Sequence, residues 1–203
     1  CRFGKKAAAY NLLHQTVNAY NQDMGIASSF EPYDVYSLHE IDPEVSNQTV
    51  YDVVFYLQTL KAPMQRNQND PEVNNGKQVF SNIGCNSCHK ETLKTGYSAI
   101  TELSNKEIHP YTDLLLHDMG SGLDDGYTEG NAKTYEWRTP PLWGLGLSPN
   151  AQGGSYFLLH DGRAKSIEEA ISMHGGEAEK SKNMYQNLPQ MSKDALLKFL
   201  KSL

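Results

Sequence analysis

The sequence contains one Cys-x-x-Cys-His string, formed by Cys85, Asn86, Ser87, Cys88 and His89. This spacing is typical of the attachment site of a c-type haem. Cys85 and Cys88 would form thioethers with two vinyl groups of the porphyrin, and His89 would supply an imidazole nitrogen to the iron. Because a tethered haem performs redox chemistry that no side chain can supply, the string predicts a redox protein.

The same cysteines could instead bind a metal or form a redox pair, and a zinc site is the main alternative to haem attachment. Zinc would need two further ligands, and the only other cysteine is Cys1. A thioredoxin-like dithiol fits less well, because no β-α-β pattern surrounds the string. A disulfide between Cys85 and Cys88 would require haem-free, oxidised protein. The residues therefore favour haem attachment.

The group that occupies the second axial position of the iron determines whether the haem transfers electrons or catalyses a reaction at the metal. The downstream candidates are the later His and Met residues: His109, His117, Met119, His160, Met173, His174, Met184 and Met191. His174 precedes Gly175-Gly176, where a backbone without side chains can pass close to a flat ring. Met173 would face about 100° around the same predicted helix, so both cannot bind. His117 and Met119 share another turn that ends at a glycine, Gly120.

Two arginines are candidate partners for the haem propionates. Arg138 and Arg163 could each make bidentate contacts with a carboxylate, and solvation at the surface is the alternative for both. His160 could hydrogen-bond a propionate or fix its own loop.

The elements that must position these residues are mainly helical. Apolar spacing and capping residues predict helices over 5–24, 46–61, 70–82 and 166–175, and a last helix that begins at Ser192. Residues 90–165 are rich in Gly, Pro, Thr and Tyr, so we expect long irregular loops wrapped around the haem. The fold class is therefore mainly α. A cytochrome c-like domain over 70–203 follows a helical segment over 1–69, which we interpret as the end of a preceding domain or a linker.

Charge and hydropathy limit the partners and the location. The formal net charge is -6 and no Lys/Arg-rich run occurs, so nucleic-acid binding is not indicated. No apolar run approaches the roughly 20 residues that a membrane-spanning helix needs. Covalent haem attachment normally takes place outside the bacterial cytoplasm, so we expect an upstream export signal and a periplasmic or outer-envelope location. Cys1 is either a lipid-bearing first residue or, as we favour, an internal residue exposed by where the sequence starts.

Several further strings carry a resemblance to a known family. They are Tyr111–Gly120 (YTDLLLHDMG), Glu136–Gly146 (EWRTPPLWGLG), Leu159–Ala164 (LHDGRA), Glu169–Ile171 (EAI) and His174–Ala178 (HGGEA). They resemble the bacterial di-haem thiol-oxidoreductase family, which is similar to the di-haem cytochrome c peroxidases and to the di-haem enzyme that matures methylamine dehydrogenase. The resemblance implies a haem domain that carries electrons within a peroxidase-like di-haem oxidoreductase.

The resemblance also bears on the sixth ligand. In the peroxidases, the C-terminal haem takes a methionine fourteen residues beyond the His of a Phe-His-(Ser/Asp)-Gly motif. The matching His here is His160, and His174 rather than Met173 stands fourteen residues further on. The related maturation enzyme uses a tyrosine at this position, so the position tolerates variation. The resemblance thus implies His89 and His174 as iron ligands, with Met119 as runner-up.

Members of that family carry an N-terminal haem domain with its own Cys-x-x-Cys-His string. Residues 1–6 (CRFGKK) are similar to a Gly-Arg-Phe-Gly-Trp-Lys segment that follows the first haem, and residues 23–26 (DMGI) support the match. We therefore interpret the chain as the C-terminal haem half, with one haem c here and a second in a missing N-terminal half. A bound calcium ion is a further possibility that the sequence leaves open.

The expected partners are the N-terminal haem domain of the same protein and a small redox protein as electron donor or acceptor. We expect this half alone to lack catalytic activity. Two other functions stay open at this point: a stand-alone mono-haem electron carrier, and a haem sensor or peroxidase whose sixth position is free.

Overall fold

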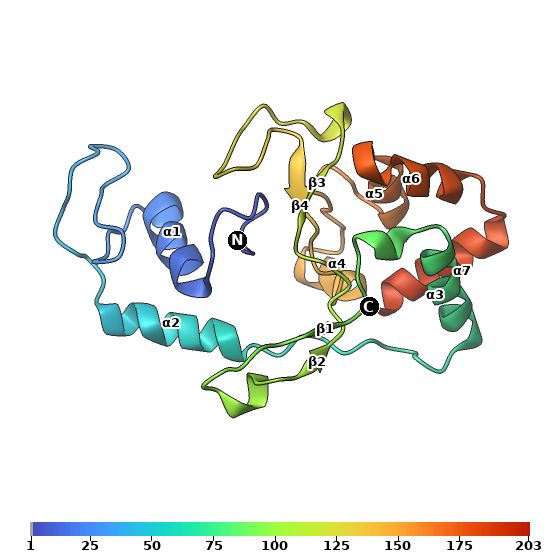
Figure 1. The fold of residues 1–203 in the computed structure, drawn as a ribbon, viewed down its shortest axis with the longest axis horizontal. Helices are drawn as coiled ribbons and strands as arrows, with labels where there is room; N and C mark the ends of the chain where they lie inside the picture. The colour runs from blue at the N-terminus through green and yellow to red at the C-terminus, as the bar shows by residue number, and fades with distance from the viewer. Residues whose placement is uncertain (1) are drawn as a thin grey trace. The chain divides into compact units, whose positions relative to one another are not determined.

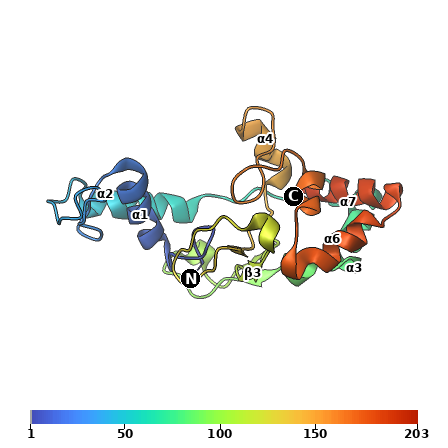
Figure 2. The same cartoon turned by 90° about the horizontal axis from the view of Figure 1, so that it is seen from above.

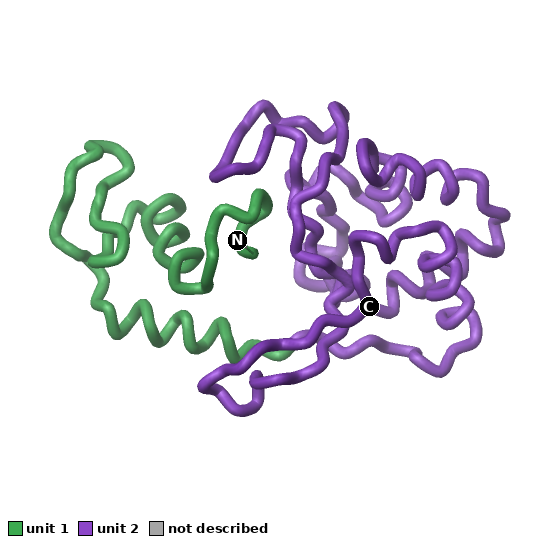
Figure 3. The backbone as a smooth tube through the Cα atoms, in the orientation of Figure 1, with its two compact units in different colours: residues 1–61 green, residues 62–203 purple. Residues whose placement is uncertain are grey.

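The computed structural model describes residues 2–203, which divide after Lys61 into two compact units (Figure 3). Cys1 lies outside the described residues, so both expectations for Cys1 concern a residue that the structure does not describe. Seven α-helices and four short strands occur in the described part of the chain (Figures 1 and 2). The chain is mainly α, as the sequence predicts. Among residues 2–203, no helix combines the length and the apolar character that crossing a membrane requires.

The first unit is built on two helices, α1 (Leu12–Met24) and α2 (Asn47–Thr59). Val17 of α1 packs with two valines of α2 in a small core. The side chain of Asn11 accepts a hydrogen bond from the amide of His14 at 2.7 Å and so caps α1. The helix therefore begins at Leu12 and not at residue 5, because the preceding residues form a turn closed by an antiparallel bridge between Phe3 and Ala9.

The second unit is organised around the crossing of α3 (Pro71–Asn82) and α7 (Gln190–Ser202) (Figure 1). A Cβ atom on Gly76 would lie 2.7 Å from the Cβ of Phe199, so only glycine permits this close approach. Phe80 and Phe199 meet edge to face, with ring centroids 5.4 Å apart. The core around this crossing consists of Val73, Val79, Phe80, Ile83, Tyr111, Ile167, Tyr185, Leu196, Leu197, Phe199, Leu200 and Leu203.

Polar side chains hold the ends of the two crossing helices. The Asp70 carboxylate accepts the amide of Glu72 at 2.8 Å, and Pro71 occupies the first turn, so α3 has the cap and the bounds that the sequence predicts. Lys198 of α7 also reaches Asp70, at 2.8 Å. The last helix begins at Gln190 instead of Ser192, because the carbonyl of Pro189 already accepts the Ser192 amide.

The long middle contains short elements that its sequence does not reveal. β1 (Leu93–Lys94) pairs with β2 (Glu107–Ile108), and β3 (Leu116–Asp118) pairs with β4 (Glu136–Arg138), both antiparallel. α4 (Ser148–Ala151) is a single turn. Strands of two or three residues are too short to show an alternating apolar pattern.

Two short helices precede α7. α5 (Ile167–Ser172) has the predicted Ser166 cap, which accepts the Glu169 amide at 3.0 Å, but it ends at Ser172 and not at Gly175. A short 3-10 turn follows in place of further α-helix. α6 (Glu179–Gln186) was not predicted, because its sequence is polar throughout except for Met184 and Tyr185.

Candidate haem-attachment site

The Cys-x-x-Cys-His string follows directly from the end of α3. Gly84 has φ +85°, a left-handed conformation that lets the chain leave the helix and enter a 3-10 helix over Cys85–Ser87. The amide of His89 donates to the carbonyl of Cys85 at 3.0 Å, which closes the turn. One tight turn therefore holds both thiols and the imidazole, as haem attachment requires.

Both thiols of the turn are free and partly buried. Burial raises the pKa of Cys85 to about 12, because this side chain packs on the core beside α3 and α7. Burial, followed by the charges of Asp113 and Glu177, also raises the pKa of Cys88. Both side chains are therefore neutral thiols near pH 7, which argues against a reactive thioredoxin-like dithiol, whose thiolate is the active form.

His89 is held in the orientation that an iron ligand needs. Its Nδ1 lies 3.0 Å from the carbonyl oxygen of Tyr111. Burial lowers the pKa of His89 to about 4, so the ring is neutral near pH 7, with Nδ1–H as the donor. The other nitrogen, Nε2, has no hydrogen-bond partner within residues 2–203 and keeps its lone pair for a metal.

Tyr111, which supplies this carbonyl, is itself an unusual residue. It has φ +54°, although a left-handed backbone is costly for an aromatic residue. Its ring is almost fully buried and meets the rings of Phe80 and Phe199 edge to face, at centroid distances of 6.1 and 5.7 Å. The core thus fixes the residue whose carbonyl orients His89.

His174 repeats the arrangement of His89. Its Nδ1 lies 2.7 Å from the carbonyl oxygen of Ala170, one turn earlier. Burial lowers its pKa, and its Nε2 lacks a hydrogen-bond partner in the described chain. A positive charge on His174 would lower the pKa of His89, so the two imidazoles lie in the same neighbourhood. The two imidazoles are therefore close enough to interact electrostatically, and their shared role as iron ligands stays a prediction.

His117, on β3, lies at the centre of a polar network beside the attachment turn. Its Nε2 bonds Asp113 at 2.9 Å and its Nδ1 bonds Glu177 at 2.8 Å. Partial burial opposes a charge on His117, but the two carboxylates outweigh it and raise its pKa. The Sγ of Cys88 lies 3.7 Å from the same Nδ1.

This network bears on whether the cysteines could form a zinc site. Cys88, Asp113 and His117 have donor atoms within 4.8 Å of one another, which is compact enough to suggest a metal. Both ring nitrogens of His117 are engaged by carboxylates, however, and an imidazolium has no lone pair for a metal. The geometry therefore favours an ion-paired network over a zinc centre. Neither carboxylate was predicted from the sequence. Asp113 belongs to no recognised motif, and Glu177 stands sixty positions from His117.

Met119, the runner-up ligand, lies on a segment that touches the segment after His174. A Cβ atom on Gly175 would lie 2.8 Å from the Met119 carbonyl oxygen, and one on Gly176 would lie 2.3 Å from the Asp118 carbonyl oxygen. From the sequence, Gly175 and Gly176 were expected to let the backbone pass close to a flat ring. In the structure, their lack of a side chain lets the backbone of residues 118–120 pack against them.

The two predicted propionate partners are placed differently. Arg163 bonds Asp161 at 2.5 Å and the carbonyl of Gly122 at 3.1 Å, so it fixes its own loop. Arg138 is partly buried on β4, and burial lowers its pKa. A propionate role for either arginine stays a prediction. His160 stacks on Trp137, with ring centroids 3.7 Å apart and planes at 9°.

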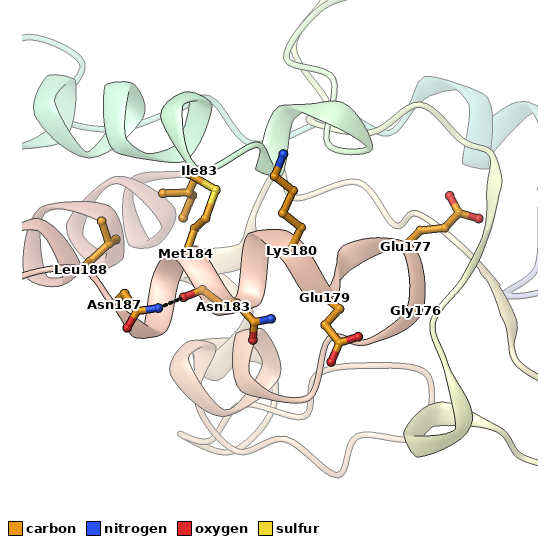
Figure 4. Close-up of a pocket in the computed structure, with 9 residues that line it drawn as sticks. All are labelled: Ile83, Gly176, Glu177, Glu179, Lys180, Asn183, Met184, Asn187 and Leu188. Atoms are coloured by element: carbon orange, nitrogen blue, oxygen red, sulfur yellow. Dashed lines mark hydrogen bonds between the residues drawn. The ribbon is translucent and has the colours of Figure 1, made fainter.

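A groove of about 720 Å³ runs between the end of α3 and α6 (Figure 4). Its apolar side chains are Ile83, Met184 and Leu188, and Lys180 and Glu179 stand at its rim. None of the four residues Cys85, Cys88, His89 and His174 lines it. The groove therefore borders the attachment turn without containing the candidate ligands.

The donor set of the second unit fits a covalently attached haem. It offers two neutral thiols on one turn and two neutral imidazoles, each anchored through Nδ1 to a main-chain carbonyl. Such anchoring is typical of histidines that bind metals. No curated protein and no solved structure matches the chain. The family described as "Di-haem oxidoreductase, putative peroxidase" matches residues 1–203, the full length of the sequence, and the chain therefore belongs to this di-haem oxidoreductase family.

Proposed function

We propose that this chain binds one haem c through Cys85 and Cys88 and carries electrons within a di-haem oxidoreductase. His89 and His174 would bind the iron of this haem. The observation that carries the proposal is the shared arrangement of the two imidazoles, each neutral, oriented by a carbonyl and left with an unpaired Nε2. When bound, the haem supplies one-electron redox chemistry.

Ligation by two histidines favours electron transfer over catalysis at the iron. If both histidines bind the iron, no position on it would be open to a substrate. On the His89 side, Phe80 lies 6.3 Å from the imidazole, centroid to centroid, and Phe80 also contacts Phe199 and Tyr111. These aromatic rings form an apolar side to His89, and low solvent exposure is one of the means by which a protein tunes a redox centre.

The arrangement of α3, the attachment turn and α7 supports a cytochrome c-like domain. The helix that leads into the turn crosses the last helix at Gly76, and the core lies at that crossing. The irregular chain between the turn and α5 wraps the haem in this proposal. Tyr111 and His117 belong to that stretch and already contact His89 and Cys88.

The second haem of the family lies on another domain in this proposal. The family is described by two haems, whereas the sequence contains one Cys-x-x-Cys-His string. That domain and a small redox protein are the partners. The location is periplasmic or at the outer face of the cell envelope, where haem attachment takes place.

The test uses the 203-residue chain, exported from a host that has haem-attachment machinery. A pyridine haemochrome spectrum is expected to show one c-type haem per chain. The ferric protein should be low-spin and indifferent to cyanide, and the ferrous protein should not bind carbon monoxide. His174→Ala should give a high-spin spectrum with the haem still attached.

His109→Ala is the matched control, because the His109 side chain is half exposed and, in the described part of the chain, contacts Thr92 and Glu107 alone. Its spectrum should equal that of the unmodified chain. Absence of covalent haem would overturn the proposal, and ready binding of carbon monoxide would favour an open-site sensor or peroxidase. An unchanged low-spin spectrum in His174→Ala would transfer the ligand role to Met119.

A further inference from the structure

The two candidates for the sixth ligand lie on segments that touch through their main chains. Gly120 has φ +77°, and a Cβ atom there would lie 2.9 Å from the amide nitrogen of Gly176. Together with the contacts of Gly175 and Gly176, this holds residues 118–120 against residues 175–176. A shift of one segment therefore displaces the other, so the positions of Met119 and His174 depend on each other.

Glu177 joins these segments by two hydrogen bonds. Its Oε2 bonds Nδ1 of His117 at 2.8 Å, and its Oε1 accepts the amide of Asp118 at 3.1 Å. Glu177 follows His174 by three residues and lies in the 3-10 helix Gly176–Ala178. One carboxylate therefore spans from the His174 segment to both residues that precede Met119.

The other side of His117 is fixed as well. Its Nε2 bonds Asp113, whose side chain is 10% exposed and also accepts the amide of Leu115 at 2.9 Å. The amide of Met119 donates to the carbonyl of Tyr135 at 3.0 Å. His117 and Met119 are thus each held by a further hydrogen bond, so Glu177 ties the His174 segment to a hydrogen-bonded part of the domain.

We propose that Glu177 and His117 form a clamp that selects His174 over Met119 as the sixth iron ligand. The inference rests on the proposed function, since it concerns the ligand of the haem at Cys85 and Cys88. Glu177 and His117 act as positioning residues. They hold the His174 segment in place, while Met119 stays next to β3 through the bond from its amide to the Tyr135 carbonyl. Without the clamp, the two segments separate and methionine competes for the iron.

The experiment uses the exported 203-residue chain and the variant Glu177→Ala. Part of the population should lose histidine ligation and gain the near-infrared charge-transfer band of a methionine ligand. The reduction potential should rise, since a methionine ligand raises it relative to histidine. Adding Met119→Leu to this variant should remove the methionine band and leave a high-spin spectrum. Glu177→Gln, which keeps an acceptor for the Asp118 amide, should restore most histidine ligation.

Glu179→Ala is the matched control. It removes the same charge two residues further on, and within residues 2–203 the Glu179 carboxylate forms an ion pair with Lys182 alone, at 3.8 Å. Its spectrum and potential should equal those of the unmodified chain. The inference is overturned if Glu177→Ala behaves like Glu179→Ala, or if the unmodified chain already has a methionine ligand.

A haem-free preparation separates failure of the clamp from failure of the proposed function. In that protein the Asp118 amide should exchange its hydrogen slowly, and Glu177→Ala should speed the exchange roughly two- to tenfold, as loss of one hydrogen bond predicts. Equal exchange rates in the two proteins would overturn the clamp whether or not haem attaches. Slow exchange combined with a failure to attach haem would instead refute the proposed function and, with it, the selection of a ligand.

Discussion

Gly76 of α3 lies against the main chain of Ala195 in α7, so closely that a Cβ atom on Gly76 would lie 2.0 Å from the Ala195 carbonyl oxygen. Such a distance is shorter than any non-bonded contact that folded proteins tolerate. The crossing stands two helical turns before the attachment turn, and the same core encloses Cys85 and Tyr111. The position of the haem-binding residues therefore depends on the helix crossing that Gly76 permits.

Gly76→Ala should destabilise the domain by about 1–3 kcal/mol, as overpacking in a closed core does. The atoms that the new methyl group would meet belong mainly to the α7 backbone, which cannot rotate away. Urea unfolding of the haem-free chain measures the effect. Asn75→Ala is the control, because Asn75 is exposed on the same helix. A Gly76→Ala protein as stable as the control would contradict the close crossing.

Asp70 should contribute to stability in a pH-dependent way. The hydrogen bond from Lys198, followed by the amide of Glu72, lowers the pKa of Asp70 below its usual 3.8. A group with a depressed folded-state pKa stabilises the fold above its unfolded pKa, and this contribution is lost as the pH falls through the folded value. Stability should therefore decline below about pH 4, and Asp70→Asn should flatten this decline.

The Asp70→Asn test keeps the helix cap, since asparagine caps helices about as well as aspartate. Free energies of unfolding at pH 7 and at pH 3 give the comparison. Asp194→Asn, on the other helix of the crossing, removes an equal charge whose carboxylate accepts a hydrogen bond from Gln190, and it should leave the acid decline in place. An unchanged pH profile in Asp70→Asn would show that the Lys198 contact does not stabilise the fold.

Arg66→Met should loosen the end of α7. The Arg66 guanidinium donates to the Lys201 carbonyl and, at 3.2 Å, to that of Leu203, and carbonyls at a helix end need such partners. The expected loss is about 1–2 kcal/mol of unfolding free energy. Amide exchange should also become faster in the last turn of α7. Lys94→Met, at an exposed lysine of β1, is the control, and equal behaviour of the two variants would contradict the capping role.

Local signals in the sequence predicted the parts of the site that are local in the chain. The Cys85–His89 turn, the Asp70 cap and the candidate His174 each depend on neighbouring residues, which a motif or a capping pattern can show. The bond between His117 and Glu177 is different, because it joins β3 to a 3-10 helix that lies far away in the chain. The close approach of these two segments depends on glycines, and no periodicity in the sequence predicts it. α6 was missed for another reason: its stability comes from packing through Tyr185, which is 6% exposed, and not from an apolar stripe.

In the haem-free chain, the thiol of Cys85 should react with alkylating reagents far more slowly than an unfolded cysteine. Burial raises its pKa from 9.0 to about 12, so at pH 8 the reactive thiolate is about a thousandfold scarcer in the folded protein. Burial, followed by the charges of Asp113 and Glu177, also raises the pKa of Cys88, so this thiol should likewise react more slowly than when it is unfolded. Mass spectrometry of peptides alkylated over time, with Cys1→Ser to remove the third thiol and urea-unfolded chain as the reference, measures all three rates. Equal alkylation of Cys85 in folded and unfolded chain would mean that this thiol is not packed on the α3–α7 core, and the proposed rigid attachment turn would fail with it.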